Sequence, residues 1–290
     1  MCEQMVLDGA LVYWLDGQLN TASAPNENLA RELMELFILG VNRYSEQDVK
    51  EAAKVLSGWK VVKHSGLVYQ NPRQSFWGSS TVLGMSDRFD AVRLARFLSE
   101  QPAAQRFIPE RLWYRFASSE TALPAGSIVE GMFAGREILP AMASLAYSMA
   151  YADASHAVVK SPLEWLVGLL RALQITPSTY GNPDYLLSRL TNLGQRPLYP
   201  PNVGGWPADE AWLSVASAQT RIFTAQMLVS RADLSPVASV AQASRLDALA
   251  DWLGVARWSA RTRAALENAA SDTRRQVTLA LCSPEYVVSA

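Results

Sequence analysis

Apolar residues in this 290-residue chain recur at three- and four-residue steps in several separate stretches, each bounded by a capping residue or a glycine. This spacing places apolar side chains on one face of an α-helix, whereas a half-buried strand needs alternation with a period of two. The clearest stretch has Leu29, Leu33, Leu36 and Phe37 on one face and is closed by Gly40. The pattern therefore predicts a mainly α fold, in the form of an irregular multi-helix bundle.

Two further helices have clear starts, because a serine cap is followed three residues later by an acid. Ser45 precedes Asp48, and Ser161 precedes Glu164 with a proline at the first helical position. The spacing predicts helices over residues 45–58, 89–100, 103–118, 138–151, 161–173, 182–194, 213–232 and 244–253, and a last one running through residue 279.

Two stretches lose the helical period. Residues 60–70 are rich in β-branched and aromatic residues around a His-Ser-Gly turn, which predicts a small β-hairpin. Residues 194–212 contain four prolines and three glycines, which predicts a long irregular loop. The chain length suits one large domain or two ordinary ones. We expect a single mainly helical domain over residues 1–290, with a subdivision near 120–155 as the alternative.

Composition excludes several classes of protein. Hydrophobic residues make up 49% of the chain and charged residues 18%, so there is ample material for a core. A formal net charge of -1 argues against a nucleic-acid partner, which usually selects a basic surface. No apolar run reaches the length of a membrane span. The first residues lack a basic region and a cleavage site, so we expect no signal peptide in this chain. Cys2 and Cys282 are too isolated for a zinc site, and no cofactor is predicted.

Polar residues are crowded at the front of the first long helix and recur on the next. The candidate polar cluster comprises Asn26, Glu27, Asn28, Arg31, Glu32, Glu35, Asp48 and Glu51. Asn26 is the expected N-cap, with Glu27 in the first turn. Glu27, Arg31 and Glu35 are four residues apart, so we expect Arg31 to pair with both acids.

The cluster has two interpretations. Glu32 with Glu35, and Asp48 with Glu51, each place two carboxylates on one helical face, where facing helices could hold Ca²⁺ or Mg²⁺ or supply a general acid and base. Alternatively, Arg31 and Lys54 neutralise these acids in a structural network, because buried charges need partners. A divalent cation at Glu32 and Glu35 is thus the metal candidate.

The loop Pro201, Asn202, Gly204, Gly205 and Trp206 is the candidate binding loop. Its glycines let the backbone bend while its prolines stiffen both sides. Trp206 could stack a sugar or a partner chain. Otherwise Trp206 fills the core and Asn202 ties the loop to the polar cluster. His64 and His156 are expected to be ordinary polar residues, and the chain contains no Gly-x-Ser-x-Gly elbow.

Three stretches together resemble signature segments of a bacterial family catalogued as domain of unknown function 1800. They are NENLARELMELFILGVNRYSEQDVKEAAKVLSGW (26–59), KSPLEWLVGLLRAL (160–173) and LGQRPLYPPNVGGWP (193–207), and the tail LALCSPEYV (279–287) is similar too. The resemblance implies a mainly helical protein, a periplasmic or extracellular location, and a sulfatase-like protein encoded next to it as a partner. It implies no established activity.

The chain also departs from the family pattern. Members are usually longer, with an N-terminal helical region that carries a Phe-Trp-His motif, so the resemblance implies that this region is lacking here. Relatives carry a His-Asp pair ahead of a Lys-Thr-x-x-Gly stretch. Ser75-Phe76 stands where that pair would fall, and Ser80 replaces the lysine. Any chemistry of those family residues is therefore expected to be lost.

The residues leave three functions open. The first is a non-enzymatic helical protein that binds or scaffolds a partner in the bacterial envelope. The second is a metal-assisted hydrolase that uses Glu32, Glu35, Asp48 and Glu51. The third is a carbohydrate-binding protein that uses Trp206 and Trp212.

Overall fold

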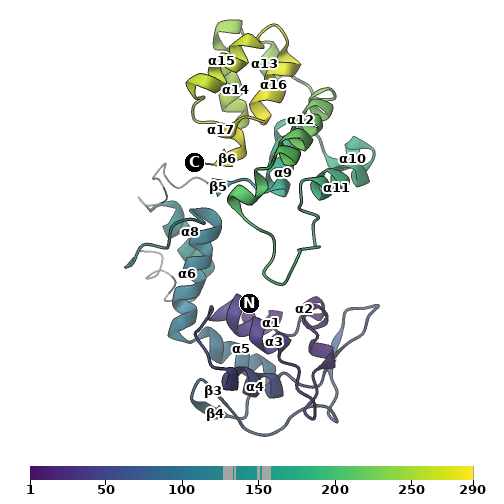
Figure 1. The fold of residues 1–290 in the computed structure, drawn as a ribbon, viewed down its shortest axis with the longest axis vertical. Helices are drawn as coiled ribbons and strands as arrows, with labels where there is room; N and C mark the ends of the chain where they lie inside the picture. Colours follow the sequence, from purple (N-terminus) through teal and green to yellow (C-terminus); the bar gives the residue numbers. More distant parts are fainter. Residues whose placement is uncertain (127–132, 134, 149–150, 152–157, 290) are drawn as a thin grey trace. The chain divides into compact units, whose positions relative to one another are not determined.

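The computed structural model describes residues 1–126, 133, 135–148, 151 and 158–289. The chain separates into two compact units, which are described one at a time (Figure 1). Unit 1 comprises Met1–Arg115 with Ala122–Ser148, and unit 2 comprises Phe116–Thr121 with Met149–Ala290. The predicted subdivision was near residues 120–155, and the boundaries between the units fall after Arg115, Thr121 and Ser148. Part of that interval lies outside the described residues. Organisation as a single domain stays a prediction.

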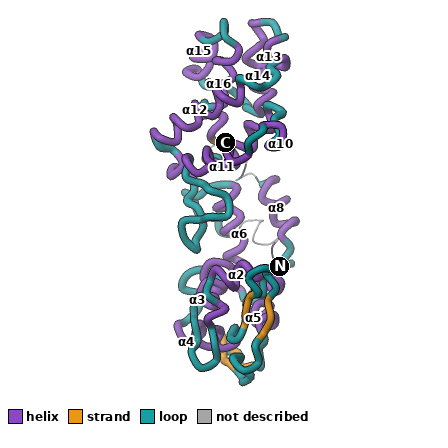
Figure 2. The backbone as a smooth tube through the Cα atoms, turned by 90° about the vertical axis from the view of Figure 1, so that its right-hand side faces the viewer, coloured by secondary structure: helices purple, strands orange, loops and turns teal. Residues whose placement is uncertain are grey.

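The expected mainly α fold is confirmed in unit 1, which consists of short helices and two small hairpins. Figure 2 distinguishes its strands in orange from the helices. The helices are α1 (Cys2–Met5), α2 (Gly9–Trp14), η1 (Gly17–Leu19), α3 (Asn28–Glu32), η2 (Leu33–Ile38), α4 (Glu46–Val55), α5 (Ala91–Ser99), α6 (Pro102–Phe116) and α8 (Ile138–Ala146).

The predicted hairpin near residues 60–70 is present. Strand β1 (Trp59–Val61) pairs antiparallel with β2 (Val68–Gln70). A second antiparallel hairpin, β3 (Ser80–Val82) with β4 (Met85–Asp87), was not predicted. Its turn is Leu83-Gly84, in which both residues have positive φ, and only the glycine signals this in the sequence. Strand β3 lies against α4, so its pairing depends on a tertiary contact.

The first long helix is not a regular α-helix to its end. After α3 the chain continues as a π-helix, η2, and the amide of Leu39 donates to the carbonyl of Met34 at 2.8 Å. Gly40 closes it as predicted, with φ of 90°. A side chain at Gly40 would also collide with the ring of Phe107, because an added Cβ would lie 2.8 Å from it.

Unit 2 is also helical, with one two-residue strand pair. Its elements are β5 (Val158–Val159), α9 (Pro162–Ala172), α10 (Pro177–Tyr180), α11 (Pro183–Asn192), η3 (Asp209–Trp212), α12 (Val215–Val229), α13 (Ser235–Ala238), η4 (Gln242–Ser244), α14 (Arg245–Leu253), α15 (Ala260–Asn268), α16 (Thr273–Leu281), α17 (Pro284–Val287) and β6 (Val288–Ser289). The single C-terminal helix expected from the sequence is instead α15, α16 and α17.

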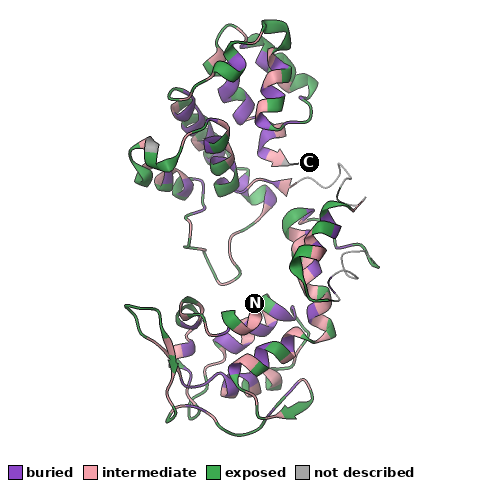
Figure 3. Ribbon diagram, turned by 180° about the vertical axis from the view of Figure 1, so that it is seen from behind, coloured by how far each residue is buried: buried purple, intermediate pink, exposed green. Residues whose placement is uncertain are grey.

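The core of unit 2 is built around Trp165 on α9, which is fully buried. Its indole N–H donates to the carbonyl of Leu281 at the end of α16, at 2.9 Å. Figure 3 shows buried positions gathered on the inner faces of the unit 2 helices. Ser161 and Glu164 form the predicted capping box at the start of α9. None of the helices in the described ranges combines the length and apolar character needed to cross a membrane.

Candidate functional site

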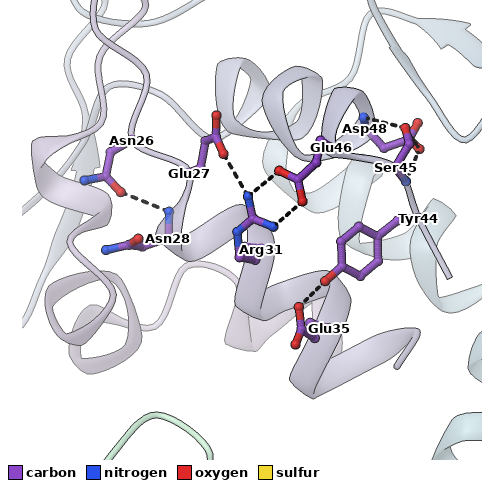
Figure 4. A network of polar contacts seen from close by, with 9 residues as sticks. All are labelled: Asn26, Glu27, Asn28, Arg31, Glu35, Tyr44, Ser45, Glu46 and Asp48. Carbon is purple, nitrogen blue, oxygen red and sulfur yellow. Dashed lines mark hydrogen bonds and ion pairs between the residues drawn. The ribbon is translucent and has the colours of Figure 1, made fainter. Parts of the chain in front are cut away.

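Arg31 joins the first helix to the start of α4 (Figure 4). Its guanidinium contacts Glu27 at 3.0 Å, as the four-residue spacing predicts. It also binds Glu46 in a bidentate manner, at 2.8 and 2.7 Å. The expected pair with Glu35 is wrong, because the wider π turn that begins at Leu33 takes Glu35 out of the four-residue register.

Glu35 is instead bound by a tyrosine. The hydroxyl of Tyr44 donates to the carboxylate of Glu35 (Figure 4). Burial, followed by this hydrogen bond, raises the pKa of Tyr44 to about 12. Burial and the neighbouring charge of Glu35 also raise the pKa of the Glu32 carboxyl. Of these two acids, Glu35 is the one that accepts the hydrogen bond from Tyr44.

Asp48 and Glu51 on α4 are each taken up by other protein groups. Asp48 accepts hydrogen bonds from the backbone and hydroxyl of Ser45, at 2.8 and 2.6 Å, and from the amide of Leu83, at 2.7 Å. Partial burial disfavours the charged form of Asp48, but these hydrogen bonds together lower its pKa. Glu51 pairs with Lys54 at 2.6 Å, and this contact is the main cause of its lowered pKa.

The two asparagines serve the loop that enters α3. The N-cap position belongs to Glu27 rather than to Asn26, which corrects the prediction by one residue. Asn26 still caps the chain locally, because its side-chain oxygen accepts from the amide of Asn28 at 3.0 Å. The amide group of Asn28 donates to Asp16 at 3.2 Å.

The sequence reasoning missed three residues of this network, Asn20, Tyr44 and Glu46. Asn20 is fully buried and connects the carbonyl of Ala53, at 2.7 Å, to the amide of Asn26, at 3.0 Å. The only sequence signal for Glu46 was its place in the first turn of α4. Nothing in the local pattern indicates that Arg31 would reach across to it.

The candidate binding loop is held by hydrogen bonds between its own residues. The side chain of Asn202 accepts from the amide of Gly204 at 2.9 Å, and its carbonyl accepts from Gly205, whose φ is 93°. Trp206 is half-buried against the core of unit 2, and its indole N–H has no hydrogen-bond partner among the described residues. The expected tie from Asn202 to the polar cluster would join the two units and stays a prediction.

The other described residues singled out in the sequence are buried, hydrogen-bonded to the backbone or placed in a turn. Trp212 is buried at 4% exposure, so its ring is not accessible for stacking a sugar. Ser75 is buried and donates to the carbonyl of Asn71 at 2.8 Å. Ser80 donates to the carbonyl of Glu51 at 3.4 Å. His64 is exposed in the turn between β1 and β2, and His156 lies outside the described residues.

Few of the described side chains are placed so that they could coordinate a metal ion together. Within the ranges that the structure describes, no three His, Cys, Asp or Glu residues are grouped so that they could hold an ion. Glu32 and Glu35 would supply two carboxylates, whereas Ca²⁺ takes six to eight oxygen ligands. A divalent cation at this pair therefore stays a prediction.

A protein-family model described as "Protein of unknown function (DUF1800)" matches residues 1–288. No match was found among curated proteins or among solved structures.

Proposed function

The chain belongs to the DUF1800 family of proteins of unknown function, and on that premise we propose that it is a non-enzymatic helical binding or scaffolding protein of the cell envelope. Its expected partner is a sulfatase-like protein encoded next to it. This partner and the envelope location are taken from what the family resemblance implies.

One observation carries the proposal, an exposed and uncharged surface on α12. We call Val215, Gln219, Ile222 and Phe223 the α12 face, since they recur at helical spacing on its exposed side. Val215 is 88% exposed and Phe223 is 55% exposed. The one charged residue of α12, Arg221, points inward and is buried. An exposed, mostly apolar surface without charges is typical of a protein-binding site.

The polar cluster supports the non-enzymatic part of the proposal. Glu27, Glu46, Asp48 and Glu51 are each engaged by a cation or by hydrogen-bond donors of the chain itself. Groups that hold helices together in this way are less free to bind a substrate or to exchange a proton. The lowered pKa values of Glu46, Asp48 and Glu51 follow from structural contacts, as also happens in ion-pair networks without catalytic roles.

The binding proposal is tested with purified chain and the purified sulfatase-like neighbour. We expect Phe223→Asp to weaken their association about tenfold or more, since a charge would enter an apolar contact. Leu187→Asp is the matched control, because Leu187 is an exposed leucine on α11, another helix of unit 2. Equal affinities for the wild type and both variants, or no association at all, would contradict the proposal.

A metal-assisted hydrolase is the second candidate, and the environment of Glu32 favours it. The pKa of this carboxyl is raised by burial and by Glu35, so a bound cation would relieve an existing cost. Calorimetric titration with Ca²⁺ and Mn²⁺ tests it. Stoichiometric binding that disappears in Glu32→Gln, together with hydrolysis of a phosphoester, would favour the enzyme over the binding protein.

A further inference from the structure

Figure 1 shows α14, α15 and α16 grouped in the C-terminal part of unit 2. Residues of these helices and of η4 line a pocket of about 460 Å³. This volume lies within the usual range for small-molecule sites. Buried Leu246 and Gln276 form its base, and exposed Gln242, Arg263 and Glu267 form its rim. None of its lining residues belongs to the polar cluster or to the α12 face.

The base of the pocket contains an acceptor without a donor. Gln276 is 1% exposed, and its side-chain N–H donates to the carbonyl of Leu266 at 3.0 Å. Its oxygen Oε1 has no hydrogen-bond partner within the described part of the chain. The neighbouring carbonyl of Ala270 already accepts from Arg245, at 3.1 Å. A buried acceptor left unpaired is costly, so a ligand that brings an N–H group would be stabilised there.

The rim carries one charge of each sign on α15. Glu267 makes no ion pair or side-chain hydrogen bond with any residue that the structure describes. Among the described residues, the guanidinium of Arg263, four residues earlier, forms one ion pair, with the exposed Asp247 at 3.6 Å. Residues four apart lie on the same face of a helix. One wall of the pocket therefore attracts a cationic group and an anionic group side by side.

We propose that this pocket binds a free α-amino acid with an apolar side chain. The ammonium group faces the carboxylate of Glu267 and donates to Oε1 of Gln276, whose covering side chains must move aside because this oxygen is buried in the unliganded chain. The carboxylate of the ligand pairs with the guanidinium of Arg263, for which this pairing is the preferred geometry. The apolar side chain packs on Leu246 and Ala243. This site goes beyond the proposed function and does not depend on it.

Calorimetric titration of the full chain with L-leucine tests the proposal. We expect a dissociation constant of about 1 mM, as suits a small ligand in an open pocket. Two analogues separate the charged contacts. Isopentylamine lacks the carboxylate and 4-methylpentanoate lacks the ammonium group, and each should bind about tenfold more weakly than leucine. L-Leucinamide, which mimics the start of a peptide, should behave as isopentylamine does.

Variants locate the binding. Glu267→Gln should weaken leucine binding about tenfold and leave 4-methylpentanoate unaffected. Glu210→Gln, an exposed glutamate of unit 2 outside the pocket, should change neither. Gln276→Met should also weaken leucine binding, and if it fails to fold, the exposed Glu267→Gln still decides the question. Thermal melting verifies that each variant is folded.

Three results would overturn the proposal. The first is the absence of heat at leucine concentrations of about 20 mM, well above the expected constant. The second is equal binding of leucine and 4-methylpentanoate, which would mean that the ammonium group is not recognised. The third is unchanged leucine binding by the folded Glu267→Gln variant.

Discussion

Single residues in the polar cluster show how far spacing determines a contact. The four-residue step from Glu27 to Arg31 predicts their ion pair, because Glu27 is the N-cap of α3 and Arg31 lies one regular turn after it. The same step from Arg31 to Glu35 fails because the helix widens between them. Arg31 also binds Glu46, the first residue of α4, which the tertiary fold brings close to it.

Replacing Arg31 with alanine tests the strength of these pairs. The Arg31 side chain is 31% exposed and its partner Glu46 is 68% exposed, so solvent screens the interaction. We therefore expect Arg31→Ala to lower the free energy of unfolding by about 1 kcal/mol, measured by urea denaturation. Arg43→Ala is the control, since Arg43 is exposed nearby. A loss equal to that of the control would mean that the pairs contribute nothing.

The raised pKa of Glu32 predicts that its carboxyl lowers the stability of the protein at neutral pH. Its pKa is higher in the folded chain than the usual 4.5, so folding is penalised once the pH rises through that folded pKa. Glu32→Gln should therefore stabilise the protein at pH 7 by a few tenths of a kcal/mol, as removal of a like-charge neighbour does. The gain should vanish below pH 4.5, where the carboxyl is protonated in both states. A gain that grows on acidification would contradict this assignment.

At the scale of elements, local capping residues predict where helices begin, whereas short strands depend on contacts with neighbouring elements. The capping boxes at Ser45 and Ser161 start α4 and α9 as the sequence predicts. The hairpin β3–β4 went unpredicted, because its three-residue strands carry little pattern and are positioned by contact with α4. Asp48 connects the two elements, since its carboxylate completes the capping box of α4 by accepting from the amide of Ser45 and also accepts from the amide of Leu83.

This double role of Asp48 predicts that its loss destabilises the protein more than the loss of the Ser45 cap. Ser45→Ala removes the cap and should cost about 1 kcal/mol, whereas Asp48→Ala also orphans the Leu83 amide and should cost about 2 kcal/mol. Urea denaturation at several pH values measures both. The pKa of Asp48 is lowered, so its contribution is present above pH 3.8 and is lost as the pH falls through the lower folded value. Equal costs for the two variants would exclude a role for the Leu83 bond.

At the scale of the molecule, the chain divides into two compact units, and the core of unit 2 is continuous from α9 to α17. Trp165 stands at its centre, contacting α16 through its indole N–H and lying beneath the guanidinium of Arg221 at 5.8 Å. Removing this ring would leave a large cavity that the surrounding helices can fill only in part.

We therefore expect Trp165→Ala to destabilise unit 2 by about 3–5 kcal/mol. Amide hydrogen exchange followed by mass spectrometry should show faster exchange in α9, α12 and α16, and unchanged exchange in α4 and α5 of unit 1. Trp14→Ala is the control, because Trp14 is 56% exposed and leaves no core cavity. Equal acceleration in both units would mean that they unfold as one cooperative body.

The sequence by itself determined the fold class, most helix starts, the first hairpin and the irregular loop near residues 194–212, because caps, glycines, prolines and apolar periodicity act over a few residues. Only the tertiary structure decided the partners of Arg31 and Glu35, the burial of Trp212 and the second hairpin. Those features depend on which distant segments meet, and no local spacing encodes the π turn of η2 or the approach of β3 to α4.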